Sequence, residues 1–174
     1  MGRPGNFQQV KLFCGIIYRD NGDCDRVAGE LEKRFSRIDS RSDVFEFDVT
    51  SYYEKEMGKP LFRRFFSFRR LICPTRLPRV KLKTNQLEEI FSRSGCRTVN
   101  LDPGFLSTGN VIIATTKNYY HRVPLQQGIY AHLEFVIKKK EIFPLEWTYP
   151  DFRSRGYRAY FTGLRQLYQE QLNA

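Results

Sequence analysis

Several kinds of sequence signal are missing from this chain, and each absence narrows its class. No apolar run is long enough to cross a bilayer, and the first residues, MGRPGNFQQ, contain no apolar leader. The four cysteines form no C-x-x-C pair and have no zinc-finger spacing. We therefore expect a cytoplasmic protein that has reduced thiols and no membrane segment.

Familiar catalytic motifs are also absent. The sequence has no G-x-S-x-G elbow, no H-E-x-x-H pair, no Rossmann fingerprint and no G-x-x-x-x-G-K-[ST] phosphate loop. No enzyme class follows from motifs, so whether the protein is an enzyme stays open, and function has to be sought in residue clusters.

What the chain does contain is positive charge and many aromatic residues. Lys and Arg number 29 against 19 Asp and Glu, which gives a net charge of +10 at pH 7. This balance favours anionic partners such as nucleotides, phosphorylated metabolites or RNA, although a basic surface also serves solubility alone. The length of 174 residues predicts a single domain over residues 1–174, and 15 Phe and 10 Tyr predict an aromatic-rich core.

The stretch VNLDPG at residues 99–104 predicts a strand that runs into a tight turn. Asn100 and Asp102 fall on the same side of this strand because strand side chains alternate. Pro103 and Gly104 are typical turn residues. We expect two polar side chains at the end of a rigid element, where a binding site is well placed, although Asp102 also suits a simple turn cap.

Hydrophobic patterning predicts an α+β fold with a mostly antiparallel sheet and helices packed on one face. The expected strands cover residues 10–18, 44–50, 61–73, 110–117, 128–138 and 141–147, with short ones at 80–83 and 119–125. The expected helices begin near residue 23 or 25, at 84 or 85, and after residue 151. The first part has the order β-α-β-β-α-β, which predicts an extended ferredoxin-like core.

Several stretches in chain order carry a family resemblance. They are VKLFCGIIY, FEFDVTSYYEKEMG, KLKTNQLE, VNLDPGF, GIYAHLEF and WTYPDFRS, together with Lys117 and His121. They resemble a bacterial and archaeal family known only as a domain of unknown function, some of whose members are labelled GTP-binding. The resemblance spans nearly the whole chain and implies no particular activity, ligand or catalytic residue. The sequence contains neither the phosphate loop nor the N-K-x-D-like base reader that the GTP label requires.

The polar phase of the predicted strands forms the first candidate cluster. Its members are Asp48, Asn100, Asp102, Tyr130, His132 and Glu134. If these strands are neighbours, Asp48, Asp102 and Glu134 converge and supply oxygen ligands for a divalent cation such as Mg²⁺, or a general base. A solvated sheet face explains the same alternation without any site.

Lys117, His121 and Arg122 form the second candidate cluster, directly after the predicted strand at residues 110–117. A Lys and an Arg beside a neutral His are suited to hold phosphate, with His121 as hydrogen-bond donor or acid and Asp102 orienting it. The alternative interpretation is a charged hairpin turn.

The stretch FRRFFSFRR at residues 62–70 interleaves Phe with Arg, as single-stranded RNA platforms do. The alternative is a core strand, because aromatic residues favour strands in any case.

Two aromatic segments complete the candidates. Tyr52, Tyr53 and Glu56 lie in a long connection that is suited to form a lid over a pocket. WTYPD at residues 147–151 forms either a second pocket wall or a plug that closes the core.

Together these patterns predict binding of an anionic ligand around Asn100, Asp102, Lys117 and His121, with Arg122 and Tyr53 as further contacts. Asp102 and His121 are the residues we would assign to catalysis. One alternative is a metal-assisted phosphoester hydrolase or transferase, and another is a protein interaction module. The sequence leaves the oligomeric state open.

Overall fold

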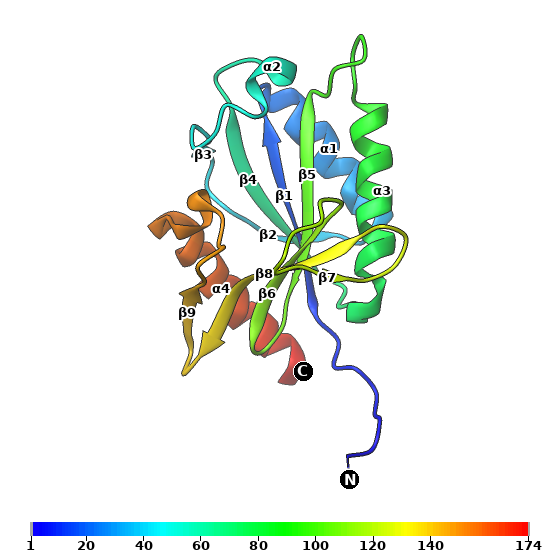
Figure 1. Cartoon of the computed structure of the whole chain (residues 1–174), viewed down its shortest axis with the longest axis vertical. Coiled ribbons are helices and arrows are strands. Elements are labelled where there is room, and N and C mark those ends of the chain that lie inside the picture. The colour runs from blue at the N-terminus through cyan, green and yellow to red at the C-terminus, as the bar shows by residue number, and fades with distance from the viewer. Residues whose placement is uncertain (1, 174) are drawn as a thin grey trace.

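The computed structural model describes residues 2–173, and its strands all belong to one sheet (Figure 1). The strands are β1 (Lys11–Tyr18), β2 (Ile38–Arg41), β3 (Phe45–Glu46), β4 (Phe62–Phe68), β5 (Val99–Leu106), β6 (Asn110–Thr115), β7 (Val123–Pro124), β8 (Tyr130–Lys138) and β9 (Glu141–Pro144). The α-helices are α1 (Asn21–Arg34), α2 (Glu54–Met57), α3 (Leu77–Ile90) and α4 (Arg155–Asn173), and the 3-10 helices are η1 (Pro74–Arg76) and η2 (Pro150–Arg153).

The sheet is antiparallel, as the sequence predicts. Its strand order is β2-β4-β1-β5-β6-β8-β7, with β3 paired to β4 and β9 paired to β8. When the short elements β3 and α2 are left aside, the first part has the predicted element order β-α-β-β-α-β. Its strand order is β2-β4-β1-β5, which leaves β1 and β4 at its centre. The α+β class is therefore confirmed.

Helices α1 and α3 cover one face of the sheet. Leu12, Cys14 and Ile16 of β1 point to this face and share a buried core with Val27 of α1 and Leu87 of α3. Asp20 caps the N-terminus of α1, where its side chain accepts hydrogen bonds from two backbone N–H groups.

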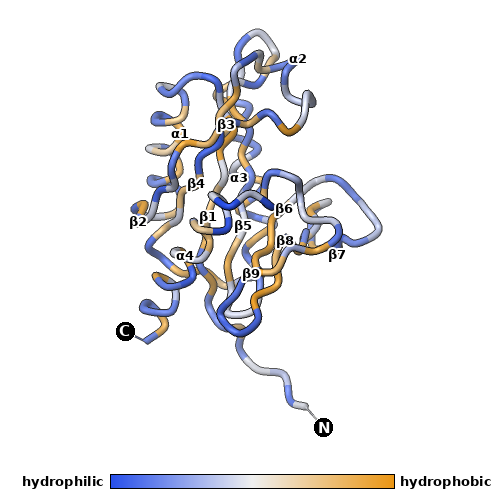
Figure 2. The backbone as a smooth tube through the Cα atoms, turned by 90° about the vertical axis from the view of Figure 1, so that its left-hand side faces the viewer, coloured by the Kyte–Doolittle hydropathy of each residue, from blue (hydrophilic) through white to orange (hydrophobic). Residues whose placement is uncertain are grey.

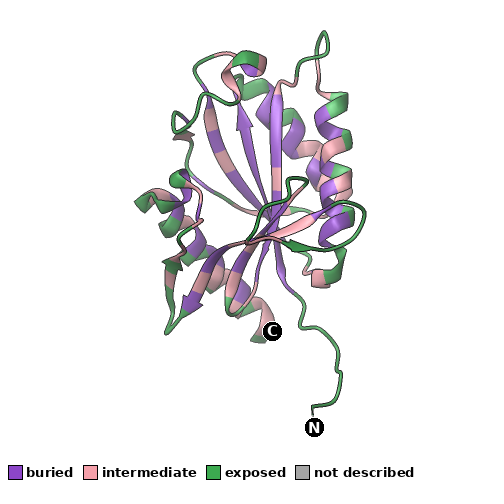
Figure 3. Ribbon diagram, viewed as in Figure 1, coloured by how far each residue is buried: buried purple, intermediate pink, exposed green. Residues whose placement is uncertain are grey.

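Helix α4 packs on the opposite face, so the prediction that all helices share one face is corrected (Figure 1). Its buried stripe includes Tyr157 and Phe161, and the rings of Phe13 and Phe65 pack against Phe161. The physical reason is that β1 and β4 bury apolar side chains on both faces, and the central strands in Figure 3 are correspondingly buried. In Figure 2 the hydrophobic residues likewise concentrate in the strands, while most of the loops are hydrophilic.

Strand β5 corrects the prediction of a tight turn at Pro103 and Gly104. The strand continues through both residues to Leu106 and pairs with β1 along its whole length. Gly104 is required there by close packing, because a Cβ atom would lie 2.4 Å from the backbone oxygen of Ile112 and 2.6 Å from the ring of Phe13.

Other boundaries also differ from the predicted ones. Residues 80–83, predicted as a short strand, belong to α3, which begins at Leu77 with Pro78 in its first turn. Of the strand predicted at 44–50, only Phe45–Glu46 pairs with β4. Strand β2 lies in a segment for which no strand was predicted.

Candidate functional site

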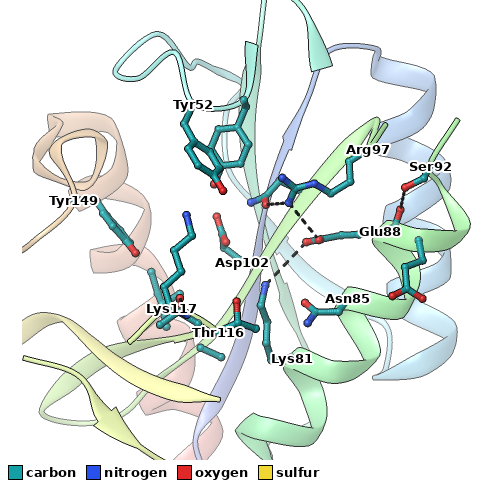
Figure 4. Close-up of a pocket in the computed structure, with 16 residues that line it drawn as sticks. Tyr52, Lys81, Asn85, Glu88, Ser92, Arg97, Asp102, Thr116, Lys117 and Tyr149 are labelled. Carbon is teal, nitrogen blue, oxygen red and sulfur yellow. Dashed lines mark hydrogen bonds and ion pairs between the residues drawn. The ribbon is translucent and has the colours of Figure 1, made fainter. Parts of the chain in front are cut away.

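A cleft opens where β5 and β6 separate, on the same face of the sheet as α4 (Figure 4). The two strands pair only from Gly104 to Leu106, and the ladder ends at Pro103, which has no N–H to donate. Two adjoining lobes of about 390 and 460 Å³ occupy the fork. Both lobes are lined by Tyr52, Tyr53, Asp102, Ile113, Lys117 and Tyr149. Volumes of this size are typical of small-molecule sites.

Helix α3 takes the place of a strand along the free part of β5. The ammonium group of Lys81 donates to the carbonyl of Leu101 at 2.7 Å, and a carboxylate oxygen of Glu88 accepts the Leu101 N–H at 2.6 Å. Burial raises the pKa of Glu88, and the charge of Lys81 opposes that shift. These two side chains satisfy the strand edge at Leu101 and fix one wall of the cleft.

Asn100 lies in the floor of the lobe beside α3, which we call the polar lobe. Its Oδ1 accepts from Arg97 at 3.0 Å, and Glu56 holds the same guanidinium through both carboxylate oxygens at 2.7 and 2.9 Å. Because a guanidinium only donates, Oδ1 must face Arg97 and Nδ2 must face away. Nδ2 is buried and has no hydrogen-bond partner.

The second lobe, which we call the apolar lobe, is lined by Ile17, Phe47, Val49 and Pro150 beside the shared residues. At its base Arg63, only 3% exposed, forms ion pairs with Asp102 and Asp151. Burial raises the pKa of Tyr149 to about 12 and also raises that of Tyr53. Both phenols therefore remain protonated at neutral pH and are able to donate hydrogen bonds.

Lys117 lies where the two lobes meet. Its Nζ is 4.0 Å from the centre of the Tyr52 ring, and Figure 4 shows the side chain reaching between Tyr149 and Asp102. The other basic side chains that line the lobes, Arg63, Lys81 and Arg97, each have a carboxylate within 4.0 Å. Among residues 2–173, Lys117 has no such partner.

Arg122 and His121 take positions that the sequence did not predict. Arg122 donates to the carbonyl of Lys117 at 2.8 Å, to Tyr149 Oη at 2.9 Å and to His132 Nδ1 at 3.3 Å. Each of its three nitrogens donates within the protein, so it holds the Lys117 segment and does not form a phosphate clamp with it. His121 stacks on Trp147 and lies outside the lining of both lobes.

His121 also has a partner other than the predicted one. Its Nε2 lies 3.0 Å from His132 Nδ1, whereas Asp102 pairs with Arg63. Burial, together with the charge of Arg122 and the neighbouring imidazole, lowers the pKa of His121. The predicted orientation of His121 by Asp102 is therefore wrong.

His132 and Glu134 are fully buried, which corrects the predicted polar face of β8. The register with β6 shifts at Glu134, because Ile112 pairs with Leu133 and Val111 with Phe135. This bulge brings Glu134 and Phe135 into the interior together. His132 Nε2 lies 2.8 Å from Glu134 Oε2, a distance at which the two atoms share one proton. Burial raises the pKa of Glu134 to about 8 and lowers that of His132 to about 4.

The proposed metal ligands do not converge. Asp48 is exposed, Asp102 pairs with Arg63, and Glu134 lies behind Tyr149, whose backbone N–H donates to it at 2.8 Å. Among residues 2–173 no group of three or more His, Cys, Asp or Glu side chains is placed to hold a metal ion.

The Arg–Phe stretch is a core strand and not a stacking platform. Phe65, Phe66 and Phe68 are completely buried, and Arg63 is nearly so. These three aromatic rings are thus unavailable to stack on bases.

The sequence did not single out Lys81, Glu88 and Arg97, which build the polar lobe. Lys81 and Glu88 were missed because the helix was predicted to start at residue 84 or 85, whereas α3 starts at Leu77. A helix begun at Pro78 would have put Lys81 and Glu88, seven residues apart, on one helical face. No sequence signal pointed to Arg97.

Comparison with other proteins bears on identity. No curated protein and no solved structure matches the chain. No described helix has the length and apolar character needed to span a membrane. Residues 8–168 match the family described as "Domain of unknown function (DUF4416)", and the chain belongs to that family.

Proposed function

We propose that this chain binds a small anionic ligand that carries an aromatic ring, of the nucleotide class, in the cleft between β5 and β6. The observation that carries the proposal is Lys117, whose ammonium group lies among aromatic side chains without a carboxylate partner in the described chain. Lys117 is exposed, and an unpaired cation at the mouth of a cleft attracts an anion.

The walls of the cleft favour a ring on that anion. Tyr52, Tyr53 and Tyr149 line both lobes, and Phe47 lines the apolar lobe. Aromatic side chains stack on nucleobases and contribute about 1–3 kcal/mol per base. A phosphorylated metabolite without a ring would use Lys117 but not these walls.

The proposal concerns binding and assigns no catalytic step. Asp102 is engaged by Arg63, and His121 by His132, so neither is poised against the other as an acid–base pair. The net charge of +10 supports an anionic ligand and does not specify which one.

A titration series tests the proposal. Wild-type protein, Lys117→Ala and Lys83→Ala are titrated with nucleotides, inorganic phosphate and a short RNA, using calorimetry and thermal shift at low salt. We expect a nucleotide to bind wild type and Lys83→Ala alike, and Lys117→Ala to lose about tenfold or more in affinity. Lys83 is exposed on α3 outside both lobes. Lys83→Ala is therefore the matched control, because it removes the same charge as Lys117→Ala. Equal affinity in all three proteins, or no binding, would overturn the proposal.

We also propose a cytoplasmic location. The four cysteines are free thiols, and a reducing compartment keeps them so.

A further inference from the structure

We infer that the ligand is a ribonucleoside monophosphate, which rests on the proposed function and specifies its substrate class. Three features of the cleft each accept one part of such a molecule. They are Lys117, which has no carboxylate partner among residues 2–173, the unpartnered amide of Asn100 beside Asp102, and the apolar lobe.

The charges around the cleft suit one phosphate group and not a chain of them. Lys81 and Arg97 line the polar lobe, but Glu88 and Glu56 already neutralise them. Glu89 adds further negative charge to the same lining. A triphosphate at Lys117 would extend among these carboxylates, and the sequence offers no glycine-rich loop to counter its charge.

Asn100 offers a hydrogen-bond donor that the protein itself does not use. The residue is 5% exposed, its Oδ1 is fixed by Arg97, and its Nδ2 is buried without a partner. Buried donors are usually satisfied, and an acceptor on a bound ligand would satisfy this one. The residue lines the polar lobe, where a ligand oxygen can supply that acceptor.

Asp102 supplies an acceptor next to this donor. It lies two residues along β5 on the same side as Asn100, and Arg63 engages only its Oδ2. Its other oxygen has no hydrogen-bond partner within residues 2–173. A donor beside a carboxylate acceptor matches a pair of neighbouring hydroxyls, because each hydroxyl both donates and accepts. The 2′ and 3′ hydroxyls of ribose have this chemistry.

The remaining part of the ligand, the base, suits the apolar lobe. Phe47, Ile17 and Pro150 line that lobe, and Tyr53 and Tyr149 lie where it joins the polar lobe. The ribose then lies at the junction of the lobes, with its diol toward β5 and its phosphate at Lys117.

The test compares ligands on the wild-type protein first. The four ribonucleoside monophosphates are titrated to find the preferred base. The nucleoside, the 2′-deoxy monophosphate and the triphosphate of that base follow under the same conditions. We expect the ribonucleoside monophosphate to bind about tenfold more tightly than each of the other three.

Two variants then test whether Asn100 is the residue that distinguishes the ribo from the deoxy monophosphate. Asn100→Ala is expected to bind the ribo and deoxy monophosphates equally, while it still prefers either of them to the nucleoside. Gln86→Ala, an exposed amide on α3 outside both lobes, is the matched control and keeps the wild-type pattern.

The possible outcomes separate this inference from the proposed function. Nucleotide binding that depends on Lys117 but shows no preference for ribose, or tighter binding of the triphosphate, overturns the inference and leaves the proposed function standing. No nucleotide binding at all overturns both. The wild-type comparison decides the question even if Asn100→Ala fails to fold.

Discussion

A single residue, Arg63, stabilises the base of the cleft through two ion pairs. Its guanidinium is enclosed among Phe47, Phe65 and Phe152 and pairs with Asp102 and Asp151. We expect Arg63→Met to lower the free energy of unfolding by about 3–5 kcal/mol, because it leaves two carboxylates without their cation. Urea unfolding followed by circular dichroism measures this change.

The matched control for this prediction is Arg70→Met. Arg70 is exposed just beyond the end of the same strand and has no ion pair among the described residues. A similar loss of stability in both variants would show that the paired charges of Arg63 have no special role.

Glu134 gives a prediction about pH. In the unfolded chain its pKa is that of an ordinary Glu, near 4.5, whereas burial raises it to about 8 in the folded protein. Above pH 4.5 unfolding therefore releases a proton, and stability falls as the pH rises toward 8. His132 has the opposite slope between about pH 4 and 6.5, because its pKa is lowered on folding. Of these two groups, Glu134 is the one that still contributes a slope between pH 6.5 and 8.

We expect wild type to lose about 2 kcal/mol of stability between pH 6.5 and 8, and Glu134→Gln to lose much less. Urea unfolding at several pH values measures both slopes. Glu141→Gln, an exposed change on neighbouring β9, should follow wild type. Parallel curves for wild type and Glu134→Gln would contradict a raised pKa.

The residues of the candidate site were only partly predictable from sequence. Alternation along one strand placed Asn100 and Asp102 on the same side, and the structure puts both beside the cleft that Lys117 also lines. The places of His121 and Arg122 depend on how the segment after β6 folds back against β8, which no local pattern encodes.

Gly104 shows how an element depends on one small residue. It lies where β5 pairs with both β1 and β6, and the ring of Phe13 and the carbonyl of Ile112 leave no room for a Cβ atom. We expect Gly104→Ala to lower the free energy of unfolding by about 1–3 kcal/mol through forced backbone shifts. Chemical denaturation measures the difference.

Gly109→Ala is the control, because Gly109 lies in the turn between β5 and β6 and nothing lies within 4 Å of its added Cβ. If the two substitutions had equal effects, the close approach at Gly104 would not explain why glycine is found there.

Elements with a long regular pattern were predictable, and those with local irregularities were not. Strand β1 and helix α4 follow their patterns over their whole length. The pattern of β8 misleads because a bulge at Glu134 changes which side chains face inward. The start of α3 was missed because Pro74 and Pro78 resemble a loop, although Pro78 suits a first helical turn.

Across the whole molecule, a single sheet carries two cores on its opposite faces. Phe13 and Phe65 belong to the α4 core, while their strand neighbours Cys14 and Phe66 belong to the core under α1 and α3. We expect Phe161→Ala to lower stability by about 3–5 kcal/mol and to preserve one cooperative transition. Near-UV and far-UV circular dichroism during urea unfolding should give the same midpoint.

Thr162→Ala, an exposed change at the next position of α4, is the control and should stay close to wild type. Separate midpoints for the two probes would mean that α4 detaches before the sheet unfolds.

The side chains of α3 that bind to β5 have a consequence beyond the cleft. An unpaired strand edge is a template on which other chains can assemble, and such edges promote aggregation. Lys81 and Glu88 occupy the main-chain groups of Leu101 that an incoming strand would need. The protein thus keeps two strands apart for an opening while denying that gap to β-strands of its neighbours.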